Sequence, residues 1–271
     1  MEQGFTNKTV MAENYGQKVH HWRKSLLFSC LALLLFSCAP EIEPVEWIAF
    51  PAGKFEKNGQ TFHLKAFEIA DREVTNAQFQ QFVSETNYIT DAEKDNYGGA
   101  VYVNDAWEIL PDANWKHPRG KSTSTEDILD HPVVQVTYND VMAYCKWAKV
   151  RLPSEKEWEF ACLEGKTSQS DINIDHTNGE AIDLLDGFLF TCPVKEFKSN
   201  NSKVYGMLGN VWEITGSAFD LNTHAKAPTF IMKGGSFLCD AIYCKGYTPE
   251  SRQSIAKNDA YFHVGFRVVR D

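Results

Sequence analysis

Apolar residues recur at helical spacing in three stretches of the sequence. The predicted helices are "TNAQFQQFVSET" (75–86), "NDVMAYCKWAK" (139–149) and "SEKEWEFAC" (154–162). Thr75 with Gln78, and Ser154 with Glu157, have the spacing of capping boxes, and Asn139 is the expected N-cap of the second helix. The apolar faces carry Phe79, Phe82 and Val83; Val141, Tyr144, Cys145 and Ala148; and Trp158, Ala161 and Cys162.

The remaining apolar runs are short and have the composition of strands. They are "HPVVQVTY" (131–138), "FIMKGGSF" (230–237) and "HVGFRVVRD" (263–271), and long polar stretches separate them. Long loops in a folded domain are usually functional or are held by metals or disulfides. The pattern therefore predicts a loop-rich α+β protein.

Composition and charge narrow the class of protein. A chain of 271 residues can form one large domain or two small ones. Its formal charge of −9 argues against nucleic-acid binding, because no broad basic face is available to neutralise phosphates.

The N-terminal segment "HHWRKSLLFSCLALLLFSCAPEIEP" (20–44) has a basic flank followed by an apolar run too short to span a membrane comfortably, as in a secretory signal. The tetrapeptide "LFSC" resembles a bacterial lipobox, which implies cleavage before Cys38 and lipid attachment to its thiol. A plain signal peptide is the alternative, and Met11 is a possible start. We expect a signal peptide at 1–37, a tether at 38–46 and a folded domain at 47–271.

Five blocks of the mature chain, in order, resemble formylglycine-generating enzymes, also called sulfatase-modifying factors. They are "FEIADREVTNAQFQQFVSETNYITDAEK", "HPVVQVTYNDVMAYCKWAKVRLPSEKEWEFA", "YGMLGNVWE", "KGGSFLC…YC" and "GFRVVRD". The stretch "NWKHPRG" (114–120) also resembles a W-x-x-P-x-G element of the catalytic branch. The resemblance implies a single irregular α+β domain, a variant of the C-type-lectin fold.

The resemblance gives a role to Cys239 and Cys244. In the family, cysteines at this spacing bind one Cu(I) ion, which thiolates suit as soft ligands, and a substrate cysteine is oxidised by O₂ to formylglycine. Three alternatives stay open: a structural disulfide, inert buried thiols, or a remnant in an inactive member.

Three further residues match positions around that site. Ser236 corresponds to an active-site serine, although it could simply cap backbone groups. Trp212 and Arg252 correspond to the substrate groove, with a core aromatic and an ion-paired arginine as the alternatives. Departures from the family pattern include Asp240 in place of a histidine and "KGYT" (245–248) in place of arginines.

The resemblance also implies calcium. Asn173, Ile174, Asp186 and Phe188 match a site built from two side chains and two backbone carbonyls, and hard oxygen ligands suit Ca²⁺. Turn hydrogen bonds are the alternative role for these side chains. Glu213 matches a weak second site, whose asparagine ligand is replaced by Gly206.

The other mature-chain cysteines have no implied catalytic role. In some relatives the counterparts of Cys145 and Cys162 form disulfides with cysteines near the C-terminus, but Pro249 and Val268 occupy those positions here. We therefore expect both to be buried thiols outside any disulfide. Cys192 has no counterpart with a known role.

Together these features predict a copper-dependent, O₂-using oxidase that converts a sulfatase cysteine to formylglycine. Its implied partner is an unfolded exported sulfatase with a C-x-P-x-R-like segment, and its location is the bacterial envelope, lipid-anchored and facing the periplasm or the cell surface. The alternative is a non-catalytic envelope lipoprotein, for example in a motility or secretion complex. An iron sulfoxide synthase is set aside, because no H-x₃-H-x-E motif is present.

Overall fold

The computed structural model describes residues 42–57, 59–94, 97–104, 106–166, 172–175, 186–219, 228–240 and 244–271. The helices are α1 (Asn76–Thr86), α2 (Tyr138–Ala148) and α3 (Glu155–Gly165). The strands are β1 (Trp47–Phe50), β2 (Gly53–Lys57), β3 (Gln60–Leu64), β4 (Phe67–Ala70), β5 (Gly99–Val103), β6 (Ala106–Leu110), β7 (Trp212–Ala218), β8 (Thr229–Lys233), β9 (Gln253–Ala256), β10 (Val264–Gly265) and β11 (Val269–Arg270).

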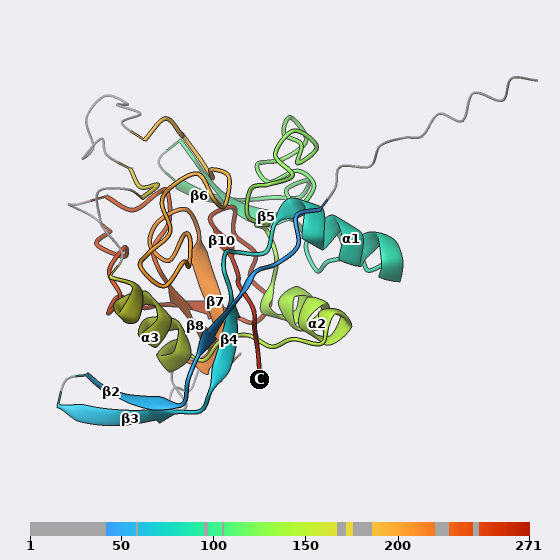
Figure 1. Ribbon diagram of the computed structural model, residues 1–271. Coiled ribbons are helices and arrows are strands. Elements are labelled where there is room, and N and C mark those ends of the chain that lie inside the picture. The colour runs from blue at the N-terminus through green and yellow to red at the C-terminus, as the bar shows by residue number, and fades with distance from the viewer. Residues whose placement is uncertain are drawn as a thin grey trace, which may run out of the picture. The chain divides into compact units, whose positions relative to one another are not determined.

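Two sheets and two hairpins organise these strands. The first sheet has the order β1-β4-β11 and is antiparallel, so the first and last strands flank β4, with both Ile48 and Val269 opposite Ile69. The C-terminus consequently lies beside β4 (Figure 1). The hairpins are β2-β3 and β5-β6.

The second sheet has the order β10-β7-β8-β9 and carries the cysteine loop. The short β10 runs parallel to β7, whereas β8 is antiparallel to both of its neighbours. The register between β7 and β8 shifts between Ile214 and Ala218. The chain leaves β8 at Lys233 and turns at once into the loop that contains Cys239.

Capping boxes begin all three helices. The predicted boxes at Thr75 and at Ser154 are confirmed. The prediction of Asn139 as N-cap is wrong, because the cap is Thr137: its hydroxyl accepts from the Asp140 N–H at 3.2 Å, and the Asp140 carboxylate accepts from the Thr137 N–H at 2.8 Å. Asn139 instead donates to Asp91 at 2.8 Å.

The stretch 131–138 does not form the predicted strand. Pro132 makes an isolated bridge to Thr75, and the Val133 N–H donates to the Val74 carbonyl at 2.9 Å. Gln135 then adopts a left-handed conformation with φ of 59°, which interrupts an extended chain. The other two predicted runs do contribute strands, β8 from the first, and β10 and β11 from the second.

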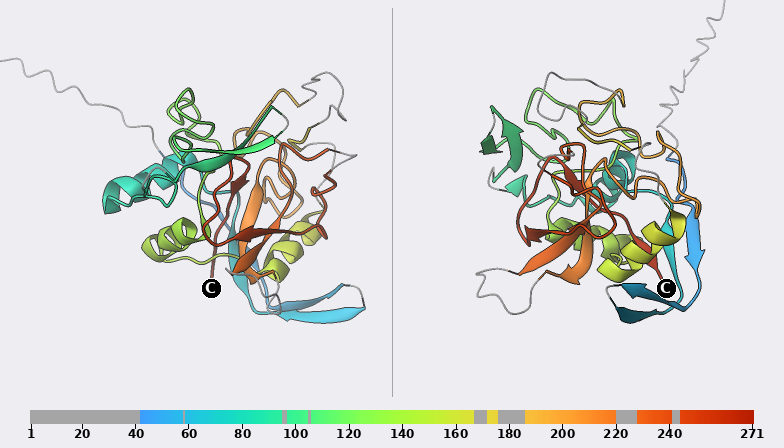
Figure 2. Two further views of the ribbon diagram at one scale, coloured as in Figure 1. Left: turned by 180° about the vertical axis from the view of Figure 1, so that it is seen from behind. Right: turned by 90° about the vertical axis from the view of Figure 1, so that its left-hand side faces the viewer.

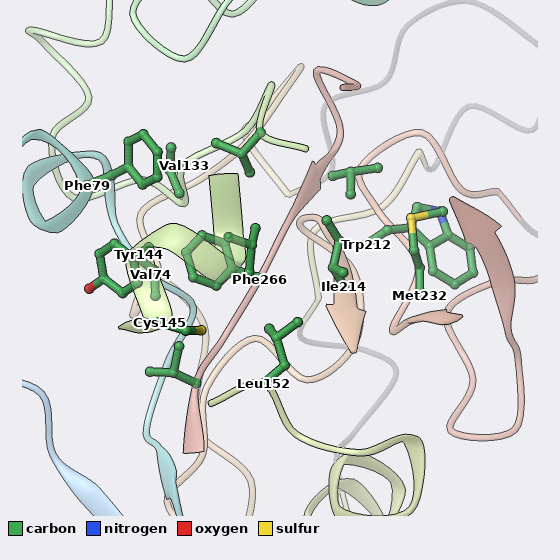
Figure 3. Packing of buried hydrophobic residues seen from close by; sticks show 14 of the residues in the cluster. Val74, Phe79, Val133, Tyr144, Cys145, Leu152, Trp212, Ile214, Met232 and Phe266 are labelled. Carbon is green, nitrogen blue, oxygen red and sulfur yellow. The ribbon is translucent and has the colours of Figure 1, made fainter. Parts of the chain in front are cut away.

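The core lies between the helices and the central strands. Helices α1 and α2 lie on one side of β4 and β7 and α3 on the other, both in Figure 1 and from behind in Figure 2. Figure 3 shows Phe266 between Tyr144 of α2 and Ile214 of β7, and the Tyr144 and Phe266 ring centroids are 5.3 Å apart. The predicted helix faces contribute the buried Phe79, Phe82, Val141, Tyr144, Cys145, Trp158, Ala161 and Cys162.

The segment just before β1 packs against the domain. The buried Arg72 donates to the carbonyls of Glu43 and Pro44 at 2.8 and 3.0 Å, and the Glu46 N–H donates to Asp71. Thus the described part of the expected tether is held by specific bonds. The expected signal peptide and Cys38 lie outside the described residues. Among the helices that the structure describes, none is sufficiently long and apolar to cross a bilayer.

Candidate metal and catalytic site

A glycine pair turns the chain from β8 into the cysteine loop. Gly234 and Gly235 have φ of 97° and 77°, a conformation that side chains rarely adopt. A Cβ on Gly235 would lie 2.7 Å from the backbone nitrogen of Tyr247. Glycine at position 235 therefore lets the segment that follows Cys244 pass close to the segment that precedes Cys239.

This turn brings the two cysteine sulfurs together. Cys239 and Cys244 form a disulfide, and their Cα atoms are 4.7 Å apart. Cys239 is 1% exposed, whereas Cys244 is half-buried. A disulfide was one of the alternatives that the sequence left open. Its reduction would leave two thiols side by side, which is the donor set that a two-thiolate Cu(I) site requires.

Ser236 is fully buried and organises the turn. Its hydroxyl accepts from the Leu238 N–H at 3.3 Å, and its carbonyl accepts from the Cys239 N–H at 2.9 Å. Backbone capping is therefore one role that the residue performs. Because a hydroxyl that accepts one bond still has its own hydrogen to donate, this role leaves the O–H available.

Trp212 lies against the cysteine pair but within the core. It is 3% exposed and belongs to the same apolar cluster as Cys239. Figure 3 shows Trp212 and Met232 of this cluster. A Cβ on Gly246 would clash with the Trp212 ring and lie 3.0 Å from the Cys239 Sγ. The indole ring thus forms a buried wall next to the sulfur.

Asp240 places a carboxylate at the cysteine loop. It is 7% exposed, and its Oδ1 accepts from the Cys244 N–H at 3.4 Å. The Cys239 carbonyl accepts from the Asp175 N–H at 2.9 Å, which ties the loop to the 172–175 segment. The loop is therefore held at both cysteines by backbone bonds.

The Arg252 side chain is held by an ion pair, an aromatic ring and a backbone carbonyl. Its Nε lies 3.4 Å from Glu155 Oε1 at the start of α3, and its guanidinium lies 4.9 Å from the centroid of the Phe219 ring. A further bond joins its Nη2 to the Phe219 carbonyl at 3.2 Å. These contacts are those of the ion-paired arginine that the sequence left open as the alternative to a groove residue.

The structure brings the four residues of the expected calcium site together. The Asp186 carboxylate accepts from the N–H groups of Ile174 and Phe188 at 3.2 and 2.9 Å, as a turn-forming aspartate does. The Asn173 Oδ1 is buried and has no hydrogen-bond partner. A buried amide oxygen without a hydrogen-bond partner is the kind of hard ligand that Ca²⁺ takes.

Both oxygens of Glu213 are bonded to protein donors. Arg267 donates to Oε1 and to Oε2 at 2.6 Å each, and the Trp158 indole N–H donates to Oε2 at 2.7 Å. The Arg267 Nη2 also donates to the Gly206 carbonyl. A guanidinium thus neutralises the carboxylate of the weak second calcium site.

Sequence reasoning missed Glu73. Burial raises the pKa of its carboxyl to about 8, with Glu213 adding to the rise and Arg267 opposing it. Its Oε1 accepts from Asn210 at 3.1 Å. The run "DRE" (71–73), three charged residues between an apolar strand and a helix, was the available signal for a buried polar cluster.

Cys145, Cys162 and Cys192 are buried, as was expected for the first two. Cys145 and Cys192 are free thiols, and Cys162 is buried in α3. Burial raises the pKa of both Cys145 and Cys192 above the ordinary thiol value. Thiols with raised pKa values are poor nucleophiles, so these positions are structural.

The fold and the site define a loop-rich α+β domain built around a cysteine-pair loop. Residues 38–271 match the family model described as "Sulfatase-modifying factor enzyme 1-like domain", and the chain belongs to that family. The predicted family and fold class are thereby confirmed.

Active and inactive relatives are both similar to this chain. The formylglycine-generating enzyme of Mycobacterium tuberculosis is 31% identical over 292 residues, covering 83% of this chain and 98% of the relative. The inactive C-alpha-formylglycine-generating enzyme 2 of Mus musculus is 32% identical over 294 residues, covering 90% and 92%. The crystal structure of CarF has the same fold, with a TM-score of 0.60 and 19% identity over 84% of this chain and 98% of CarF.

Proposed function

We propose that this protein is a copper-dependent, O₂-using oxidase that converts a cysteine of an exported sulfatase to Cα-formylglycine. The observation that carries the proposal is the contact between the Cys239 and Cys244 sulfurs, at the position where the family binds copper. Two adjacent thiols fit Cu(I), which prefers soft sulfur ligands at low coordination number.

The reduced thiolates of Cys239 and Cys244 would hold the metal. Bound Cu(I) would supply the oxygen chemistry and an open position for the substrate thiol. Ser236, three residues before Cys239, has an O–H that could donate to the metal-bound groups, and the Trp212 ring covers the buried side of Cys239. Gly246 packs so closely against the Trp212 ring and the Cys239 sulfur that no side chain would fit at this position.

The proposed substrate is an extended sulfatase segment that resembles C-x-P-x-R. A net charge of −9 would favour the approach of a cationic segment through long-range attraction. The signal sequence and Cys38 would anchor the enzyme by lipid in the bacterial envelope, where exported sulfatases emerge unfolded.

Mass spectrometry of a C-x-P-x-R peptide tests this function. The purified protein is reduced, loaded with Cu(I) and mixed with peptide in aerated buffer, and the peptide cysteine should become an aldehyde. Cys239→Ala and Cys244→Ala should each abolish conversion and copper binding, whereas Cys192→Ala, at a buried thiol outside the site, should preserve both. Conversion by either site variant would refute the assignment.

A calcium ion at Asn173 and Asp186 is the second proposed cofactor, supported by the orphaned Asn173 Oδ1. Addition of Ca²⁺ should raise the melting temperature, because a ligand that binds only the folded state stabilises it. Asp186→Asn should remove that rise. Asp112→Asn is the matched control, since the Asp112 carboxylate also accepts a backbone N–H, from Lys121 at 3.1 Å. An equal rise in both variants would exclude this site.

A non-catalytic envelope lipoprotein is the competing function. Asp240, in place of the family histidine, puts a buried carboxylate beside the cysteine pair and favours this alternative. Failure of the reduced protein to bind Cu(I) would support it. Tight copper binding without peptide conversion would instead point to a different substrate segment.

A further inference from the structure

A cavity of about 360 Å³ opens between three loops of the domain. Its walls come from the "NWKHPRG" element and the residues that follow it, from residues 128–134 before α2, and from residues 187–191. This volume lies in the range of sites that enclose small organic ligands. Neither Cys239 nor Cys244 lines it.

Arg119 supplies the charge of this cavity. Its guanidinium lies 3.5 Å from the centroid of the Phe190 ring, and burial lowers its pKa. No carboxylate pairs with it among the described residues, and no Asp or Glu is among the described residues that line the cavity. In a protein with 36 acidic and 27 basic side chains, a half-buried arginine that has no acidic partner among the described residues is unusual.

The other lining groups complement an anion with an apolar body. Ser122 contributes a hydroxyl, and the Thr191 hydroxyl lies 3.0 Å from Nδ1 of His131, which also lines the cavity. Phe190 and Phe262 form an aromatic wall, with centroids 6.4 Å apart. Asn76 also lines the cavity, and its Oδ1 is buried without a hydrogen-bond partner. A ligand that has both an acid group and an N–H donor would satisfy these groups together.

We propose that this cavity binds an organic carboxylate with an aromatic or branched apolar body, and that Arg119 pairs with the carboxylate. The guanidinium is already stacked on Phe190, so its orientation is set before a ligand arrives. The proposal does not depend on the oxidase function, because the cysteine pair contributes nothing to the cavity.

A matched pair of probes tests the site in the full chain. N-acetylphenylalanine carries a carboxylate, an N–H donor and a ring, and N-acetylphenylalaninamide differs from it by lacking the charge. Isothermal titration calorimetry near neutral pH should show the acid binding about tenfold or more tightly than the amide. Equal affinities would overturn the proposal.

Substitutions of Arg119 test whether this residue causes the preference for the acid over the amide. Arg119→Gln should remove the preference for the acid, and Arg119→Lys should keep part of it because the cation remains. Arg270→Gln is the control, since Arg270 also stacks on an aromatic ring, Trp47 at 4.4 Å, but pairs with Glu68. An unchanged preference in Arg119→Gln would exclude Arg119 as the anion partner.

A short peptide that ends in phenylalanine distinguishes the two sources of such a carboxylate. Tighter binding of the peptide than of N-acetylphenylalanine would support a chain terminus as the ligand. Tighter binding of the free acid would support a small molecule. Either result supports the site only if Arg119→Gln also weakens the binding of the ligand that binds more tightly. If Arg119→Gln leaves that affinity unchanged, the ligand binds elsewhere.

Discussion

The cysteine site depends on single positions where a side chain is missing. Gly235 permits a left-handed turn and a close backbone approach, and Gly246 lets the chain pack directly against the Trp212 ring and the Cys239 sulfur. Sequence alone identified the cysteines through the family frame. It did not reveal the glycine contacts, because these join residues that meet only in the folded chain.

Gly235→Ala should destabilise the protein by about 1–3 kcal/mol, because the new Cβ would be strained at φ of 77° and would crowd Tyr247. Gly59→Ala is the matched control. Gly59 has φ of 74° with nothing within 4 Å, so only the backbone strain of about 1 kcal/mol is expected. Urea unfolding of both variants measures the difference, and equal costs would contradict the close approach at Gly235.

The buried Glu73 makes stability depend on pH. Its folded pKa of about 8 lies above the ordinary 4.5, so between these values the folded protein retains a proton that the unfolded chain has lost. The contribution of Glu73 to the free energy of unfolding is therefore present at low pH and is lost as pH rises toward 8.

Glu73→Gln should flatten this dependence. The slope of the unfolding free energy between about pH 5 and pH 8 should become less negative by up to about 1.4 kcal/mol per pH unit. Urea unfolding across that range provides the measurement, with the exposed Glu126→Gln as the control. An unaltered slope in Glu73→Gln would show that another group titrates.

Local elements were largely predictable, and the exceptions have local causes. Two capping boxes have glutamate or glutamine at the third helical position, the usual signature, whereas the box of α2 uses Asp140 and was missed. The short apolar run 131–138 has the composition of a strand. It is interrupted at Gln135, whose left-handed backbone no apolar pattern encodes.

Thr137→Ala should destabilise the protein by about 1 kcal/mol, because the Asp140 N–H loses its acceptor at the start of α2. Thr137→Ser keeps a hydroxyl and should cost less. Chemical denaturation of these variants and of Asn139→Ala distinguishes the observed cap from the one predicted from sequence. A larger loss in Asn139→Ala than in Thr137→Ala would favour the sequence prediction.

Across the whole domain, the contacts that determine the architecture are non-local, and the sequence did not predict them. β1 and β11 pair with opposite edges of β4, and no periodicity within either strand specifies that pairing. The family resemblance supplied the fold class instead. Arg267 also joins distant parts of the chain, since it contacts Glu213, the carbonyls of residues 205 and 206, and Glu73.

Arg267→Met should therefore cost about 3–5 kcal/mol, because it leaves the carboxylate of Glu213 buried without its cation. Adding Glu213→Gln to this variant should recover part of the loss, since the neutral amide can still accept from Trp158. Arg270→Met removes a surface ion pair with Glu68 and should cost about 0–1 kcal/mol.

Denaturant unfolding of the three variants measures these free energies. Similar losses in Arg267→Met and Arg270→Met would mean that other groups compensate the buried charge of Glu213. A double variant less stable than Arg267→Met would mean that the Glu213 carboxylate stabilises the domain through groups other than Arg267.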